Sequence, residues 1–152
     1  DSAVSMLQKF ASNFVSTNSF HLNGDQKGGQ YSSLTYRPFT LEGNFAFAQG
    51  VQELLLQTRE GVIEVFPAIQ ESWKDVSFRT LRAEGAFLVS ATKENGIVKD
   101  VLVKSEAGGT CLLRLPFKQW TISGIDKNKV KVKEEVMEIP MIKGQEVRLG
   151  GF

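Results

Sequence analysis

After Gly61 the apolar residues recur at every second position, and turn residues interrupt them at short intervals. Period-two runs of this kind indicate short strands with one buried face. The clearest case is Phe87 to Lys104, where Asn95-Gly96 separates two alternating segments. An Asn-Gly pair in that position favours a type I′ hairpin turn. Seven or eight such runs reach the C-terminus, which predicts an antiparallel β-sandwich over residues 61–152.

The chain before Gly61 has helical spacing at both ends. Apolar residues fall at i, i+3, i+4, i+7 and i+8 from Leu7 onward, which predicts a helix from Ser2 to about Thr17. A second helix is predicted from about Phe45 to Gln57, with Asn44 as its N-cap. It is apolar around most of its circumference, which is typical of a buried helix, and Gly50 in its middle indicates close packing. The fold class is therefore α+β.

The segment between these helices, from Asn18 to Leu41, is a long loop, and such loops are often functional. It contains His21, the single histidine, which could serve as a base or a ligand. We expect it to pack within the loop instead, because no cysteine or second histidine offers a metal set. Tyr31, Tyr36 and Phe39 could stack on a sugar or fix the loop to the body of the domain.

Composition excludes several classes of function. The 152 residues carry a formal net charge of +1, and 41% are hydrophobic. This balance does not favour a nucleic-acid partner, and no apolar run is long enough to span a bilayer. A single cysteine, Cys111, excludes an internal disulfide and a multi-cysteine metal site, and its strand-like setting predicts a buried thiol. We expect no metal and no cofactor.

Two further features allow a functional and a structural interpretation. Alternating lysines at 127, 129, 131 and 133 could contact nucleic acid, but a solvated strand face with Val130 and Val132 opposite explains them. Trp73 and Trp120 could be platforms for sugar rings. They could equally be core or domain-seam residues, which we favour.

A series of motifs spans the junction between the two regimes. It begins with the run Pro38-Phe39-Thr40-Leu41-Glu42-Gly43-Asn44-Phe45 and continues with the run from Gly50 to Gln57. Three more follow: Phe66-Pro67-Ala68, the run from Leu81 to Phe87, and the run from Gly108 to Arg114. Over residues 38–115 this series resembles the C-terminal part of glycoside hydrolase family 95, which includes α-L-fucosidases and enzymes acting on α-L-galactosides.

The resemblance implies an (α/α)6 barrel followed by a β-sandwich. Residues 1–60 would then be the last two helices and a long loop of that barrel, and residues 61–152 the sandwich. The family hydrolyses glycosides with inversion: one carboxylic acid protonates the leaving oxygen, while a carboxylate assisted by asparagine amides activates water. That carboxylate belongs to an Asp-Gly-Asn-Phe-Gly motif in the family. Here Glu42 stands at its position, and Ala46 replaces the last glycine.

The resemblance makes Glu42 the candidate general base and makes Asn44, Phe39 and Tyr36 candidates for substrate binding. A carboxylate at a helix start is stabilised as an anion by the helix dipole. Glutamate adds a methylene to the family's aspartate. A displacement of about 1 Å can lower a rate on the order of 10²-fold, so this change could abolish activity, alter the substrate or be compensated by the backbone.

Length limits what this chain could do alone. Twelve helices of about 11–12 residues need roughly 130–140 residues, and only two helices are predicted here. We therefore expect the C-terminal portion of a family 95-like enzyme, inactive without the rest of its barrel. Its partners would be a fucosylated or galactosylated glycan and the missing helices, its location extracellular or periplasmic, and its bare helix faces would promote self-association. The alternative is a free-standing β-sandwich that binds carbohydrate or protein.

Overall fold

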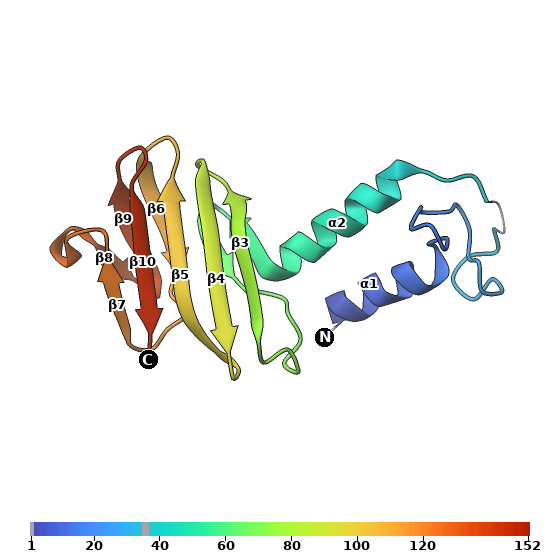
Figure 1. Ribbon diagram of the computed structural model, residues 1–152, viewed down its shortest axis with the longest axis horizontal. Coiled ribbons are helices and arrows are strands. Elements are labelled where there is room, and N and C mark those ends of the chain that lie inside the picture. The colour runs from blue at the N-terminus through green and yellow to red at the C-terminus, as the bar shows by residue number, and fades with distance from the viewer. Residues whose placement is uncertain (1, 35–36) are drawn as a thin grey trace. The chain divides into compact units, whose positions relative to one another are not determined.

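The computed structural model describes residues 2–34 and 37–152 and has the expected α+β class (Figure 1). Two compact units divide the chain, Asp1–Leu54 and Leu55–Phe152. The first contains α1 (Ser2–Asn13) and nearly all of α2 (Leu41–Leu55). The second contains ten strands and one short 3-10 helix, η1 (Lys127–Lys129). The strands are β1 (Leu56–Arg59), β2 (Val62–Val65), β3 (Val76–Ala83), β4 (Phe87–Glu94), β5 (Ile97–Ser105), β6 (Gly109–Arg114), β7 (Trp120–Ser123), β8 (Lys131–Lys133), β9 (Val136–Met141) and β10 (Glu146–Gly151).

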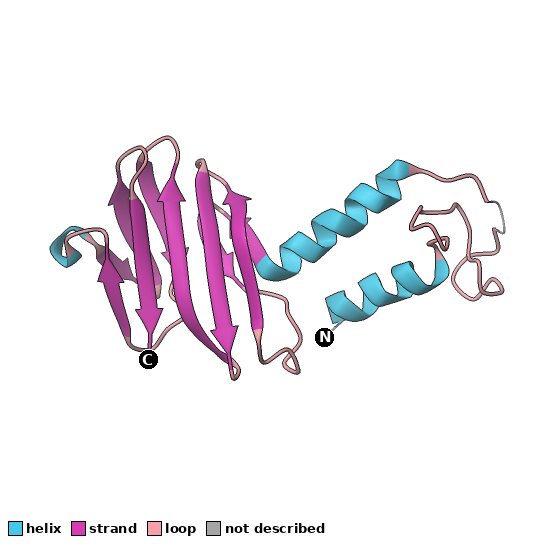
Figure 2. Ribbon diagram, in the orientation of Figure 1, coloured by secondary structure: helices cyan, strands magenta, loops and turns pink. Residues whose placement is uncertain are grey.

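The strands form two five-stranded sheets that face each other as a sandwich (Figure 2). One sheet has the order β1-β2-β6-β9-β8 and the other β3-β4-β5-β10-β7. Ten strands slightly exceed the seven or eight expected. One cause is that α2 ends at Leu55, so the next residues form β1 where the sequence predicted the end of a helix. Seven of the eight pairings between these strands are antiparallel, and β2 with β6 is parallel.

The core of the sandwich follows from strand alternation. Val89 on β4 and Val101 and Val103 on β5 are fully buried, while the residues between them are partly exposed. The other sheet contributes Cys111, Leu113, Met137 and Ile139 in the same way. Because every second side chain enters the shared interior, both sheets are held together by burial of apolar surface. The predicted burial of Cys111 is confirmed.

The predicted Asn95-Gly96 turn is present, and a second glycine-containing turn follows it. Asn95 and Gly96 have φ angles of 50° and 79°, as a type I′ turn requires, and Glu94 pairs with Ile97. Gly108 and Gly109 also have positive φ angles and connect β5 to β6. Since β5 and β6 belong to different sheets, this second turn carries the chain from one layer of the sandwich to the other.

Helix α1 is shorter than predicted and packs against α2. It ends at Asn13, whose side-chain amide donates to the Lys9 carbonyl at 2.8 Å, because Val15 then forms an isolated β-bridge with His21. A Cβ atom on Gly50 would lie 2.9 Å from Leu7 Cδ2, so the close packing predicted for this glycine is confirmed. The Phe10 and Phe47 rings also stack across the two helices, with centroids 5.6 Å apart.

Helix α2 is not buried in this chain, although its sequence predicted a buried helix. Leu54 is the one buried residue among those described in α2, and Leu41, Phe45 and Val51 are exposed by 44%, 68% and 38%. Apolar residues lie around most of α2, as in a helix with neighbours on several sides. Among the described contacts, α1 packs on one side of α2. The described residues therefore leave a large part of its apolar surface bare.

The lysine row does not form a single strand face. Lys127 and Lys129 lie in η1, and only Lys131 and Lys133 lie on β8, where Val132 between them is 48% exposed. The Asp126 carboxylate accepts the Asn128 N–H at 2.9 Å and starts the 3-10 turn, so Lys127 and Lys129 do not lie on a strand. No helix among the described residues is long and apolar enough to cross a membrane.

Candidate functional site at the start of helix α2

A short antiparallel pairing brings two distant parts of the long loop together in front of α2. Leu22 and Phe39 form a β-bridge, the Thr40 N–H donates to the His21 carbonyl at 3.2 Å, and Asn23 donates to Pro38 at 3.1 Å. The pairing places His21 beside the first residues of the helix. The motif from Pro38 to Phe45 therefore begins in this pairing and continues as the start of α2.

His21 lies against the first turn of α2. Its Nδ1 is 2.7 Å from Thr40 Oγ1, and its ring stacks on Phe10 with centroids 5.1 Å apart. A Cβ atom built on Gly43 would lie 2.3 Å from the same Nδ1. Glycine at position 43 is therefore needed for the imidazole to occupy this place. The expectation that His21 packs within the loop agrees with these contacts, but the sequence did not place it against Gly43 and Asn44 of α2.

Asn44 fixes this arrangement. Its Oδ1 accepts the His21 N–H at 2.8 Å, and its Nδ2 donates to the Ser19 carbonyl at 2.7 Å. Helix α2 begins at Leu41, so Asn44 lies within its first turn and the predicted N-cap role is wrong. Both polar ends of its amide hold the preceding loop. A contact between Asn44 and substrate remains a prediction, and such a contact would have to share these atoms.

Glu42 is the acidic residue of the first turn of α2, and it is exposed. The unpaired N–H groups of a helix start carry partial positive charge, which stabilises a carboxylate there as an anion. An exposed anionic carboxylate can accept a proton from a water molecule. The general-base role of Glu42 stays a prediction.

The other carboxylates described in this unit do not supply a partner acid. Asp25 is 2% exposed, and its oxygens accept the Tyr31 N–H at 2.9 Å and the Lys27 N–H at 2.7 Å. These N–H groups, with Tyr31 foremost, hold the pKa of Asp25 below its ordinary value of 3.8. Glu53 lies eleven positions after Glu42 on α2, about 16 Å along the axis at 1.5 Å per residue. An inverting pair is separated by about 6.5–9.5 Å.

The aromatic candidates have different surroundings. Phe39 is 57% exposed and packs on Phe20 with ring centroids 5.0 Å apart. Substrate binding by Phe39 stays a prediction. Tyr36 lies outside the described residues. Tyr31 faces the Lys9 ammonium group, which lies 5.7 Å from the ring centroid.

His21 is the residue whose position the sequence did not reveal. Its signal was only that the chain has one histidine, because the pairing that carries it to α2 joins residues about twenty positions apart. Among the described residues, no group of three histidine, cysteine or acidic side chains could hold a metal ion.

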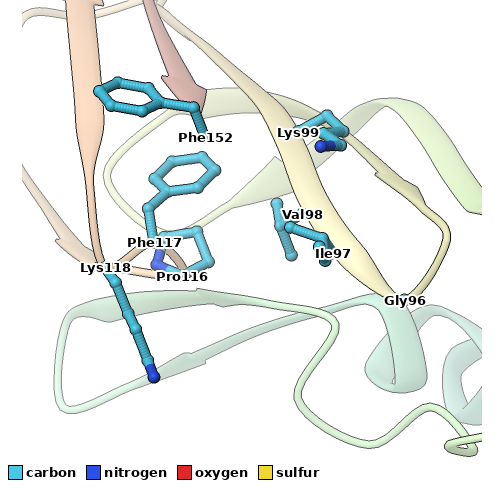
Figure 3. A pocket seen from close by; sticks show the side chains of 8 residues that line it. All are labelled: Gly96, Ile97, Val98, Lys99, Pro116, Phe117, Lys118 and Phe152. Atoms are coloured by element: carbon cyan, nitrogen blue, oxygen red, sulfur yellow. The ribbon is translucent and has the colours of Figure 1, made fainter.

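The sandwich has a second candidate site near its aromatic residues. A hollow of about 480 Å³ is lined by Phe117, Phe152, Val98, Lys99 and Lys118, among others. Figure 3 shows the two phenylalanine rings close together, across from Val98 and Lys99. A Cβ atom on Gly151 would lie 2.1 Å from the Phe117 ring, so this glycine lets Phe117 pack on β10. Most of the side chains that line the hollow are apolar, and Lys99 and Lys118 add positive charge.

Neither tryptophan presents a fully exposed ring face on which a sugar could stack. Trp120 packs partly against the core, and the Lys127 ammonium group covers its ring at 4.8 Å from the centroid. Trp73 is half-buried and donates its backbone N–H to the Gln70 carbonyl at 3.0 Å. A structural role explains Trp120 without a ligand.

The two-layered sandwich, preceded by helices and a carboxylate at a helix start, is the arrangement that the motif series implied for a carbohydrate-active protein. Residues 57–149 match the family described as glycoside hydrolase family 95, C-terminal domain. The chain belongs to this glycoside hydrolase family. The match begins within β1 and ends within β10, so it covers nearly all of the sandwich. No curated protein matches the chain.

Proposed function

We propose that this chain is the C-terminal portion of an inverting exo-glycosidase that acts on α-L-fucosides or related α-L-galactosides. In this proposal α1 and α2 are the last helices of an (α/α)6 barrel, and the sandwich supports that barrel. The observation that carries the proposal is the bare apolar surface of α2, on which Leu41, Phe45 and Val51 are exposed. Such a surface fits a helix whose neighbours belong to another part of the enzyme.

Glu42 is the proposed general base. It would remove a proton from water as the water attacks the anomeric carbon, while a carboxylic acid on the upstream barrel protonates the leaving oxygen. Asn44, Phe39 and Tyr36 would border the sugar. His21 supports the turn through Thr40 and Gly43, so it is proposed as a positioning residue.

The chain alone would not hydrolyse glycosides, because the described carboxylates near Glu42 provide no second acid. The same bare helix surface would make the isolated chain self-associate. As a glycan-degrading enzyme, the protein would act outside the cytoplasm, either extracellular or periplasmic.

The test joins the chain to the barrel. The gene is extended upstream of Asp1, and hydrolysis of fucosylated and α-L-galactosylated oligosaccharides is measured with the extended protein and with the 152-residue chain. We expect activity with inversion from the extended protein and none from the chain. Activity from the chain alone, or an upstream sequence that encodes no further helices, would overturn the proposal in favour of a free-standing module.

A further inference from the structure

The outward face of the sheet β3-β4-β5-β10-β7 carries a polar hollow that the proposed hydrolysis does not use. Its volume is about 520 Å³, within the range of about 300–1,000 Å³ found for small-molecule sites. Four strands line it. Its polar side chains are those of Arg79, Thr80, Ser90, Thr92, Asp100 and Arg148.

Strand register explains why these groups meet. Ser90 pairs with Leu102, and Leu102 pairs with Arg148, so these three side chains stand in one row across β4, β5 and β10. Val89 and Val101, which neighbour this row along their strands, are fully buried on the opposite face. The row therefore faces away from the core, with the partly exposed Leu102 between a hydroxyl and a guanidinium group.

The neighbouring row contributes Thr92 and Asp100 to the hollow. Thr92 pairs with Asp100, and Asp100 pairs with Gly150. Gly150 has no side chain, so nothing from β10 stands beside Asp100 in this row. The position of a Cβ atom on Gly150 lies 3.0 Å from Thr121 Oγ1, so Thr121 of β7 lies over this glycine. The Asp100 carboxylate forms an ion pair with Arg148, with Oδ1 3.5 Å from Nη1.

The backbone at one edge of the hollow is strained. Thr80 has a φ angle of 57°, which is unfavourable for a β-branched residue. It lies in a β-bulge between Phe78 and Leu81, and its N–H donates to Ser90 Oγ at 3.0 Å. Glycine adopts this conformation without strain. Strained residues of this kind concentrate at functional sites, so a threonine here supports a role in the hollow.

The charges of the hollow favour an anionic ligand. Two guanidinium groups and one carboxylate line it, which leaves a formal charge of +1. The four ion pairs between described residues take up Arg82, Lys104, Arg114 and Arg148, and none includes Arg79. A guanidinium group binds a carboxylate or sulfate through two parallel hydrogen bonds. Hydroxyl and carboxylate side chains can bond to sugar hydroxyl groups.

We propose that this hollow binds an anionic saccharide residue, with its carboxylate or sulfate on Arg79 and its hydroxyl groups on Asp100 and Ser90. The site would hold an acidic glycan on the sandwich, apart from the residues proposed for hydrolysis. It lies entirely within Leu55–Phe152 and does not depend on Glu42. Its failure would leave the proposed glycosidase function standing, and the reverse also holds.

The test is a titration of the ¹⁵N-labelled 152-residue chain, followed by amide chemical shifts. The probes are digalacturonic acid, galactose 6-sulfate, neutral galactobiose and inorganic sulfate, each at millimolar concentration and low salt. We expect shifts at Thr80, Ser90 and Asp100 with one or both acidic sugars. Binding of the uronate alone identifies a carboxylate site, and binding of the sulfated sugar alone identifies a sulfate site.

Variants make the assignment to Arg79 specific. Arg79→Ala should weaken binding of the acidic sugar at least tenfold, and Arg79→Lys should weaken it less. Arg82→Ala is the matched control on the same strand, because Arg82 pairs with Glu106 and does not line the hollow. Equal binding of galactobiose, equal binding of inorganic sulfate, an absence of shifts at the lining residues, or equal losses in the two alanine variants would overturn the proposal.

A further variant tests the strain. Thr80→Gly should raise the melting temperature, because glycine accepts the positive φ angle, and should weaken binding because the threonine side chain is lost. A lower melting temperature, or unchanged binding, would remove Thr80 from the proposed site.

Discussion

Gly43 and His21 occupy one space: the position of a Cβ atom on Gly43 is 2.3 Å from Nδ1 of the imidazole and 2.4 Å from its Cγ. The absence of a side chain on Gly43 therefore leaves room for the His21 ring, and each residue of the Glu-Gly-Asn sequence has a distinct structural role. Glu42 faces solvent, Gly43 admits the ring, and Asn44 binds the backbone that carries the ring.

Gly43→Ala should destabilise the first unit, although alanine is the better helix former by about 1 kcal/mol. Overpacking costs about 1–3 kcal/mol, and the ring cannot retreat without breaking its contacts with Thr40 and Phe10. Urea unfolding followed by circular dichroism measures the loss. Gly50→Ala is the comparison: its Cβ atom meets the flexible end of Leu7, so the cost should be smaller. Adding His21→Ala should restore stability to Gly43→Ala, and no restoration would contradict the shared space.

Glu42→Gln in the extended enzyme should lower kcat about 10²–10⁴-fold, as loss of a general base does. The reason is that glutamine cannot accept the proton from water. Hydrolysis rates are compared with those of Glu71→Gln, which removes an exposed carboxylate from the sandwich. Equal rates in the two variants would contradict the assignment.

Glu42→Asp tests whether the backbone is adapted to glutamate. We expect a loss on the order of 10²-fold, because shortening the side chain withdraws the carboxylate by about 1 Å. A faster enzyme with aspartate would show instead that the turn is still arranged for the shorter residue.

Asp25 should make the order of its loop depend on pH. Because the N–H groups of Tyr31 and Lys27 lower the pKa of this carboxyl in the folded chain, its stabilising effect is fully present above the ordinary value of 3.8. The effect is lost as the pH falls through the lower, folded pKa. Amide shifts of Lys27 and Tyr31 should follow this titration. In Asp25→Asn the pH dependence should disappear, and its persistence would assign the transition to another group.

Cys111 should be inert in the folded chain. It is fully buried, and burial raises the pKa of its thiol to about 12, so almost no thiolate exists at pH 8. A disulfide reagent should react with it only after unfolding. Cys111→Ser should cost about 1–3 kcal/mol because it buries a hydroxyl in an apolar core, and Cys111→Ala separates this cost from the loss of volume. Rapid labelling of native protein would contradict the prediction.

Phe45→Ser should reduce self-association of the isolated chain. Phe45 is 68% exposed on α2, where the proposed barrel contact lies. Sedimentation velocity compares it with Ile142→Ser, which removes a residue that is 74% exposed on the sandwich. Equal sedimentation of both variants and the parent chain would show that α2 does not drive association.

The sandwich could be predicted because its signals are local. Asn95 and Gly96 are residue types that favour the positive φ angles of this turn. The alternation of apolar and polar residues around Val101 predicts which side chains are buried. The assignment of Leu56 to the second helix is wrong. An apolar residue that follows an apolar helix gives no local sign of a strand, and Leu56 belongs to β1 because it pairs with Val65. The prediction that the four lysines share one strand face is also wrong. Asp126 starts a 3-10 turn there, and the spacing of the lysines gives no sign of this turn.

The candidate site was only half visible in the sequence. Glu42 and Asn44 stand close together in the chain, and the motif series identified them. His21 joins them through a short pairing, in which Leu22 pairs with Phe39 and the Thr40 N–H donates to the His21 carbonyl, and so short a pairing leaves no periodic pattern. Asn44 illustrates a different difficulty: a helix-start position predicts a cap, but the amide is used to hold another segment.

The parallel pairing of β2 with β6 has a consequence for how the protein is made. Val62 pairs with Leu112, and Ile63 pairs with Leu113, so the two strands emerge from the ribosome fifty residues apart. At about 5–20 residues per second, β2 waits roughly 3–10 seconds for its neighbour. Strands β3, β4 and β5 can pair as hairpins during that time. Three strands of one sheet can therefore pair before β6 is synthesised, while β2 of the other sheet has an open edge that favours aggregation until β6 pairs with it.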